Sequence, residues 1–279
     1  MFKYMKKIGL SALLALALLT GCGDGGEKQA QLHLQKAEQA LLMENFSEAK
    51  LQIDSIKMLY PKAFEARKQG IKVMQQVDLK EQTKTLAYLD SVMLVKQAQL
   101  DSIKGDFVLE KDTAYQDVGN YFYPTQTVEK SLGRSFLRGQ VTELGEMSLT
   151  SIYCAGGQLH HTSVKVSVGD IFAETSISKD SYETTDLGKT IEKSDYKIGE
   201  DGGVVGFIIA NQDKNIQLQF IGDKTYRTAM DKNDRKAIVK LADLARILSS
   251  MEEIRKQQKE ASLKIQFVSR KIEEGQTVK

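Results

Sequence analysis

The sequence predicts an α+β protein in which helices at both ends of the chain enclose a mostly antiparallel β domain. Residues 27–104 and 231–279 place apolar residues at three- and four-residue spacing, which is typical of amphipathic helices. Residues 105–230 are richer in glycine, threonine, valine and tyrosine, and apolar and polar residues alternate there as in half-buried strands. The two helical segments are therefore expected to form a base that presents the β domain.

The first 21 residues have the layout of an export signal. Lys3, Lys6 and Lys7 precede an uncharged apolar run at residues 8–19. This run is shorter than the roughly 20 residues that a membrane-spanning helix needs. The sequence therefore predicts a signal peptide, residues 1–21, that is removed from the mature chain.

The segment ends in Leu19-Thr20-Gly21-Cys22, which resembles the lipobox of bacterial lipoproteins. This resemblance covers only the start of the chain. It implies cleavage before Cys22 and attachment of lipid, including acyl groups such as palmitate, to the Cys22 thiol, so that the chain meets the membrane through its N-terminal lipid. Gly23 stands where an aspartate would resemble an inner-membrane retention signal, so the resemblance implies a cell-envelope protein at the outer membrane.

The mature chain is close to electrically neutral. The full sequence has 39 basic and 37 acidic residues, and loss of the three signal-peptide lysines leaves 36 against 37. We expect no nucleic-acid partner, because nucleic-acid binding needs a basic surface. With Cys22 consumed by lipid, Cys154 is the only other cysteine, and no internal disulfide is expected.

A short flexible tether, residues 22–26, precedes two predicted helices. Their apolar positions are Ala30, Leu34, Ala37 and Leu41, and then Ala49, Ile53, Ile56 and Leu59. The connection from Asn45 to Ala49 resembles the inter-helix turn of a tetratricopeptide repeat. Thr83 and Val95 interrupt a second copy, so we expect one tetratricopeptide-like hairpin and not a peptide-binding array. A generic helix pair is the alternative.

Two long helices are predicted from uninterrupted helical patterns. Residues 62–104 lack proline and carry a heptad-like seam at Leu79, Leu86, Met93 and Leu100. Residues 232–272 lack proline and glycine, and Asp231 stands before them as an N-cap. Their similar lengths and matching seams predict antiparallel coiled-coil packing, and self-association of these helices remains open.

The β domain shows strand-like segments separated by turns. The predicted strands are residues 136–143, 147–154, 159–168, 171–178, 204–210 and 216–221. The predicted turns are at residues 156–157, 169–170, 201–203 and 211–215. A two-residue turn at Gly156-Gly157 would pair Tyr153 with His160 and Cys154 with Leu159.

Cys154, His160 and His161 are candidates for a nucleophile or a metal site, because thiols and imidazoles serve both roles. In the predicted hairpin His160 shares the apolar face with Val164, so we expect a half-buried core histidine stacked on Tyr153. His161 lies diagonally across from Cys154 on the other face, where that hairpin supplies no carboxylate. We interpret Cys154 as a small buried residue. No catalytic residue, metal or cofactor is assigned.

The sequence contains no H-E-x-x-H, G-x-S-x-G or P-loop pattern. The glycines of residues 199–206 do not have G-x-G-x-x-G spacing and lead into a predicted strand, so we interpret them as a turn. The chain is therefore interpreted as non-enzymatic.

The leading hypothesis is a membrane-anchored lipoprotein that acts as a protein-interaction or scaffold module for an envelope partner. The alternative is binding of a small ligand or glycan through the β domain, with Tyr121, Tyr123, Tyr153 and Tyr182 as candidate contacts. Two of these belong to the aromatic cluster at residues 120–124, which we interpret first as a cap on the core. A deep polar pocket would favour a small ligand, and an exposed apolar patch would favour a protein.

Overall fold

A computed structural model describes residues 26–131, 133–186 and 188–277 of the chain. The predicted signal peptide, the lipobox cysteine Cys22 and the tether up to residue 25 lie outside these ranges. The predicted α+β class is confirmed. Within the described ranges, no helix combines the length and the apolar composition that a membrane span requires. The described residues form two compact units, the first from residues 26–88 and 259–277 and the second from residues 89–258.

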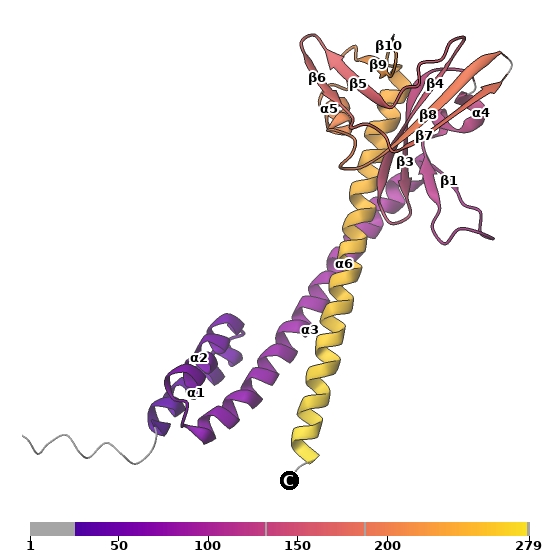
Figure 1. Cartoon of the computed structure of the whole chain (residues 1–279). Helices are drawn as coiled ribbons and strands as arrows, with labels where there is room; N and C mark the ends of the chain where they lie inside the picture. Colours follow the sequence, from indigo (N-terminus) through magenta and orange to yellow (C-terminus); the bar gives the residue numbers. More distant parts are fainter. Residues whose placement is uncertain (1–25, 132, 187, 278–279) are drawn as a thin grey trace, which may run out of the picture. The chain divides into compact units, whose positions relative to one another are not determined.

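The first unit is built on a helical hairpin of α1 (Glu27–Leu42) and α2 (Phe46–Leu59), as Figure 1 shows. Ala37 and Ala49 are fully buried, so small side chains let the two helices approach closely. The Asn45 side chain accepts a hydrogen bond from the Glu48 backbone N–H at 3.2 Å and caps α2. The predicted helix pair and its turn are therefore confirmed.

The hairpin packs on the first part of the long helix α3 (Phe64–Ile103). The Glu27 carboxylate accepts a hydrogen bond from the Ala66 backbone N–H at 2.7 Å, which ties the start of α1 to the first turn of α3. Lys50 of α2 reaches Glu81 of α3 at 2.5 Å. Apolar contacts complete the core of this unit, through buried residues that include Leu34, Ile53, Ile56, Val73 and Val77.

The second unit contains the last part of α3 and the first part of α6 (Lys232–Thr277). Gln258 Nε2 of α6 donates to Asp90 Oδ1 of α3 at 2.7 Å, and Lys240 Nζ of α6 lies 3.8 Å from Asp106 Oδ2, in the short helical turn that directly follows α3. Because residue numbers rise along one helix as they fall along the other, these contacts confirm antiparallel packing of the two helices within this unit. The predicted N-cap Asp231 is also confirmed, since its side chain accepts the backbone N–H two residues later at 2.7 Å.

Two antiparallel sheets form the rest of the second unit. The six-stranded sheet has the order β1 (Val108–Glu110), β2 (Asn120–Phe122), β3 (Phe136–Thr142), β4 (Met147–Ala155), β8 (Lys189–Lys197) and β7 (Asp180–Asp186). The four-stranded sheet has the order β10 (Thr225–Ala229), β9 (Gln217–Ile221), β5 (Ser163–Val168) and β6 (Ile171–Glu174). Short helical elements connect the strands: η1 (Lys104–Asp106), η2 (Pro124–Gln126), α4 (Val128–Ser131) and α5 (Val204–Ala210).

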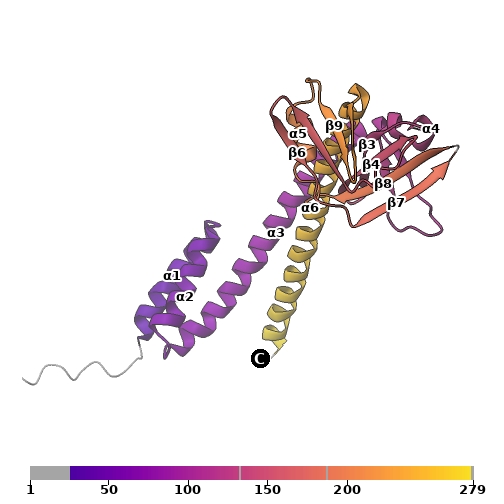
Figure 2. The ribbon, with the colours of Figure 1, turned by 45° about the horizontal axis from the view of Figure 1, so that its top comes forward.

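The core of the second unit joins both sheets to α6, which runs beside them in both views (Figures 1 and 2). Alternate residues of β3, β4, β5 and β9 point into it, and α6 contributes residues at helical spacing. The fully buried members include Leu137, Leu149, Val164, Val166, Phe220, Ile238, Leu241 and Leu244. This single core holds the two sheets together, so a side chain from one sheet can reach the backbone of the other.

Two sequence predictions about the secondary structure of this unit are wrong. Residues 204–210 form the helix α5 and not a strand, with Val204, Val205 and Ile208 buried on one helical face. The turn at residues 156–157 does not close a hairpin, because β4 lies between β3 and β8 and the next strand, β5, belongs to the other sheet. The turn at residues 169–170 is confirmed, since it joins β5 to β6.

Candidate functional site

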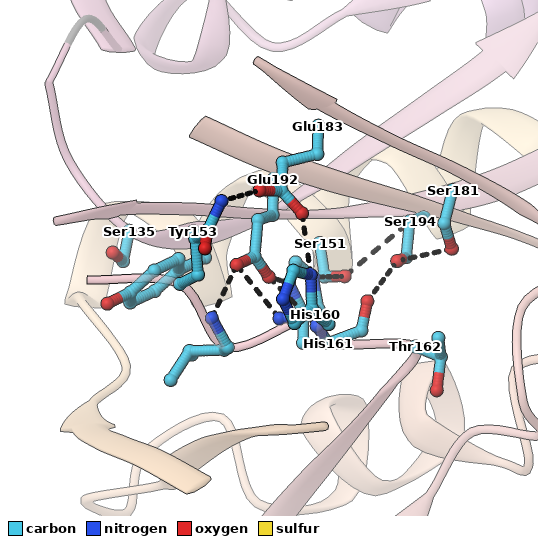
Figure 3. Close-up of polar contacts among 12 residues, drawn as sticks. Ser135, Ser151, Tyr153, His160, His161, Thr162, Ser181, Glu183, Glu192 and Ser194 are labelled. Carbon is cyan, nitrogen blue, oxygen red and sulfur yellow. Dashed lines mark hydrogen bonds and ion pairs between the residues drawn. The ribbon is translucent and has the colours of Figure 1, made fainter. Parts of the chain in front are cut away.

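The polar side chains with the densest mutual contacts lie where the chain passes from β4 to β5 (Figure 3). Glu192, on β8, has a side chain only 3% exposed. Its Oε1 accepts the backbone N–H groups of Leu159 at 2.6 Å and His160 at 3.0 Å. Its Oε2 accepts the backbone N–H and the ring Nδ1 of His161, both at 2.8 Å. The carboxylate of one sheet therefore fixes the segment that leads into the other.

His161 continues this network to β4. Its Nε2 lies 2.7 Å from Ser151 Oγ, and both side chains are buried. Since an ionised Glu192 can only accept, the geometry assigns the ring proton to Nδ1 and makes Nε2 the acceptor of the Ser151 hydroxyl. The ring also packs edge-on against Phe220 and Tyr153, with centroids 5.3 Å and 6.4 Å away.

The pKa values of both ionisable partners are lowered. Burial lowers the pKa of His161, and this effect exceeds the upward effect of Glu192. Burial raises the pKa of Glu192, but hydrogen bonds from His161, Leu159 and His160 outweigh it, so the net pKa lies below its ordinary value. At neutral pH the pair is therefore a neutral imidazole beside an ionised carboxylate.

Ser151, His161 and Glu192 have the order of contacts of a serine hydrolase relay, in which histidine activates the serine hydroxyl and the acid orients the histidine. A nucleophile must meet its substrate, however, and Ser151 is fully buried with its Oγ also 3.1 Å from the Tyr196 hydroxyl. The neighbouring amides of Leu159, His160 and His161, which could stabilise an oxyanion, all donate to Glu192. The arrangement therefore serves the fold.

Among the residues that the structure describes, one cluster of side chains has metal-ligating groups: His160, Glu183 and Glu192 each place a ligand atom within 4.8 Å of the others. Glu183 Oε2 lies 2.8 Å from His160 Nδ1. Each oxygen of Glu192 already accepts two N–H groups, so only His160 and Glu183 remain, fewer than the three protein ligands of a catalytic zinc site. The donor set therefore does not fit a metal centre.

The sequence interpretation of the two histidines is wrong. His160 is exposed, adopts a left-handed φ of 52°, and does not stack on Tyr153. His161 is the buried residue, and it contacts Tyr153, Ser151 and Glu192. The cause is the absent hairpin, since the face assignments assumed that residues 159–168 pair with β4. Cys154, expected to be buried, is half-buried, and its backbone N–H donates to Ser135 Oγ at 2.9 Å.

The structure does not bring the four candidate tyrosines together. Tyr121 and Tyr123 are half-buried and pack on the core, as the core-cap interpretation predicts. Tyr153 is buried, and its hydroxyl donates to the Gly157 carbonyl oxygen at 2.9 Å. Tyr182 is 63% exposed on β7, four strands from Tyr121 in the sheet order, roughly 19 Å at about 4.8 Å per strand. They do not form one binding site.

A groove of about 750 Å³ lies in the second unit between the β3–β4 turn, the end of β8 and α6. Met147 and Ala245 are buried and form its floor, while Glu146, Lys197 and Arg246 are exposed at its rim. It is lined by Thr142, Gly145, Glu146, Met147, Ser148, Lys197, Ile198, Ala242, Ala245, Arg246 and Ser249. The groove is thus apolar at its base and carries both signs of charge at its edge.

Large apolar side chains remain exposed beside this groove. Ile198 is 53% exposed and Leu144, at the tip of the β3–β4 turn, is 42% exposed. Gly145 follows Leu144 with a φ of 84°, and a Cβ there would lie 2.2 Å from the Ser249 backbone nitrogen. The turn therefore rests directly on the α6 backbone, which fixes one wall of the groove.

The sequence analysis did not identify the residues that build the Glu192–His161 network or the groove. Glu192 lies on a strand whose buried positions include Thr190, Glu192 and Ser194, so its period-2 pattern is visible only when polar residues are allowed to face inward. The groove needs the register of β4 against β8, which brings Ser148 opposite Lys197. No local pattern in the sequence specifies that pairing.

Comparison of the chain with protein-family models, with curated proteins and with solved structures gives no significant match.

Proposed function

We propose that this chain is a lipid-anchored protein of the cell envelope, at the outer membrane, which binds a protein partner through the groove between the β3–β4 turn, β8 and α6. The anchoring part rests on the lipobox-like segment ending in Cys22. The binding part rests on one observation, the exposed Ile198 and Leu144 beside an apolar groove floor. The role is one of interaction or scaffolding and not of catalysis.

The shape of the apolar surface favours a protein over a small molecule. A small ligand fills a cavity and buries most of its own surface there, whereas a protein covers a wider patch around it. Ile198 lines the groove and is 53% exposed, and Leu144 is exposed on the adjoining β3–β4 turn outside the lining, so a partner that covers both must extend beyond the groove. The groove also combines apolar lining residues with the exposed charges of Glu146, Lys197 and Arg246, as protein interfaces combine apolar and polar side chains.

Photo-crosslinking in living cells tests the binding proposal. A photoreactive residue at Ile198 should give one reproducible crosslinked protein, and the same residue at Ile171, which is 54% exposed on β6, should not. Once that protein is purified, Ile198→Glu should weaken its binding by about tenfold or more, because a charge replaces an apolar contact. Equal binding by the Ile198→Glu variant and by an Ile171→Glu control would reject the groove as the interface.

Acylation is tested separately. Metabolic labelling with a palmitate analogue should mark the wild-type chain and not the Cys22→Ala variant, and the variant should leave the membrane fraction. A Cys22→Ala protein that still incorporates the palmitate analogue would contradict the anchoring proposal and leave the groove proposal to its own test.

A small ligand in the same groove is the second candidate function, because about 750 Å³ lies within the size range of ligand sites. None of the four candidate tyrosines lines this groove, so a glycan site built on them is not supported. Thermal unfolding with ligand panels distinguishes the candidates, since a ligand at about 100 times its dissociation constant adds roughly 2.7 kcal/mol of stability. A stabilising metabolite whose effect is lost in Ala245→Arg would favour this function.

A further inference from the structure

We propose that the α2–α3 connection of the first unit is a second membrane contact, which inserts Met58, Leu59 and Phe64 into the lipid surface beside the anchor. This proposal rests on the acylation of Cys22 proposed above. It adds a defined face of the folded chain to a contact that would otherwise consist of lipid alone.

The three side chains are large, apolar and exposed. Met58 is 77% exposed, Leu59 is 63% exposed and Phe64 is 71% exposed, although α2 and α3 bury other apolar residues in the core of the unit. All three lie within seven consecutive residues at the end of α2 and the start of α3. An exposed apolar group of this kind marks a binding surface for lipid or protein.

This connection lies at the same end of the unit as the start of α1. The Tyr60 ring packs on Gly26, where a Cβ would lie 2.7 Å from Tyr60 Cδ1. The Glu27 carboxylate accepts the Ala66 backbone N–H at 2.7 Å. Figures 1 and 2 both show α1 and α3 beginning side by side.

The distance from the anchor keeps this end close to the bilayer. Three residues lie between Cys22 and Gly26, which makes four steps along the chain. A chain spans at most about 3.6 Å per residue, so an acylated Cys22 holds Gly26 within about 14 Å of that cysteine. The end of the unit that carries Met58, Leu59 and Phe64 would therefore stay near the lipid surface.

The charges around the three residues favour a membrane as the occupant. Residues 57–68 contain four basic side chains, Lys57, Lys62, Arg67 and Lys68, and one acidic side chain, Glu65, for a net charge of +3. The three lysines are exposed. Apolar side chains flanked by basic ones are the composition of interfacial membrane contacts, because the apolar groups enter the acyl region and the lysines meet anionic headgroups.

The absence of tryptophan from the chain allows a direct test. Phe64→Trp places the only tryptophan at the proposed contact, and Leu42→Trp places it at the other end of α1, at a residue that is 79% exposed. Each full-length variant is expressed in a Gram-negative host, purified in acylated form and reconstituted on phosphatidylcholine vesicles with and without phosphatidylglycerol. The mass of the N-terminal peptide establishes acylation independently of the fluorescence.

We expect the Phe64→Trp emission to shift to shorter wavelength on vesicles and to be quenched by brominated acyl chains, while Leu42→Trp keeps the emission of a hydrated side chain. Vesicle binding of the unacylated mature chain, residues 22–279 with Cys22→Ser, should fall by about tenfold in Phe64→Ser, since burial of phenylalanine contributes at least that factor. Replacing Lys57, Lys62 and Lys68 by glutamine should weaken binding to the anionic vesicles, and the control replacement of Lys36, Lys72 and Lys80 should not.

Acylated protein with hydrated emission from both tryptophans would overturn this inference and leave the proposed anchoring intact. A blue shift of Phe64→Trp that needs no vesicles and grows with protein concentration would also overturn it, because the surface would then be an interface between copies of the chain.

Discussion

The Oε2 atom of Glu192 lies 2.8 Å from both the backbone nitrogen and the ring Nδ1 of His161. One oxygen on the six-stranded sheet thus sets the position and the proton placement of the residue that leads into the four-stranded sheet. The other oxygen accepts two further backbone N–H groups, so the pair closes a fully satisfied polar network inside an apolar core.

Replacing Glu192 by glutamine should destabilise the second unit by about 2–4 kcal/mol, because the new amide group turns a donor toward buried N–H groups. Urea unfolding followed by circular dichroism measures this loss. Glu183→Gln is the matched control, since that carboxylate is 30% exposed and should cost less than about 1 kcal/mol. Equal effects of the two substitutions would show that the network does not hold the sheets together.

Stability should fall as the pH drops below about 6.5. The pKa of His161 is lowered in the folded chain, so the unfolded chain binds a proton first, near the ordinary pKa of 6.5, and stability is lost from there downward. The lowered pKa of Glu192 adds a second loss that begins near its ordinary pKa of 4.5. Urea unfolding midpoints measured between about pH 7 and pH 4 test both losses of stability.

The variants His161→Gln and His160→Gln separate this effect from general acid sensitivity. His161→Gln should flatten the pH dependence between about 6.5 and 5, whatever its absolute stability, because the group that titrates is gone. His160→Gln removes the neighbouring exposed imidazole and serves as the control. A wild-type slope in His161→Gln would assign the acid sensitivity to other groups.

Gly145→Ala should destabilise the second unit by about 2–4 kcal/mol, because the position has a left-handed φ and its Cβ would overlap the α6 backbone. Thermal unfolding measures the loss. Gly156→Ala is the matched control, since a Cβ added there would have no described atom within 4 Å beyond its chain neighbours, and the φ of Gly156 is not positive. A Gly145→Ala protein as stable as Gly156→Ala would mean that the turn does not rest on the helix.

Asp234→Ala should cost about 2–3 kcal/mol, because it removes a buried acceptor from the Gln126 amide and the carboxylate that pairs with half-buried Arg134. Asp234 accepts from Arg134 at 2.6 Å and 2.9 Å and from Gln126 at 3.0 Å, and its side chain is only 3% exposed. Chemical denaturation measures the change. The control Asp243→Ala removes an exposed pair with Arg246 in the same helix and should change stability by less than about 0.5 kcal/mol; a similar loss in both variants would contradict this account.

Local patterns predicted the helices well. The 3.6-residue period fixed the hairpin and both long helices, and Asn45 and Asp231 cap helices as their residue types suggest. Predicted strands 136–143 and 147–154 match β3 and β4 within one residue. Each of these elements carries its information within a few neighbouring positions.

The sequence predictions that were wrong or missing concern features that depend on contacts between residues far apart in the sequence. Residues 204–210 are a short apolar run, for which period alone does not separate strand from helix. β7 is mostly exposed at the edge of its sheet and carries few apolar residues, so it was not predicted. The partner of His161 is Glu192, 31 residues away, and only the pairing of β4 with β8 brings it near.

The link between β4 and β5 couples the unfolding of the two sheets of the second unit. The amides of residues 159–161 belong to the link between the sheets, yet their acceptor stands on β8 of the six-stranded sheet. Separating the sheets would leave the buried Glu192 carboxylate without its hydrogen-bond donors. Local unfolding of one sheet alone is therefore unfavourable. Deuterium should therefore enter the central strands of both sheets at one common rate, as a single cooperative event.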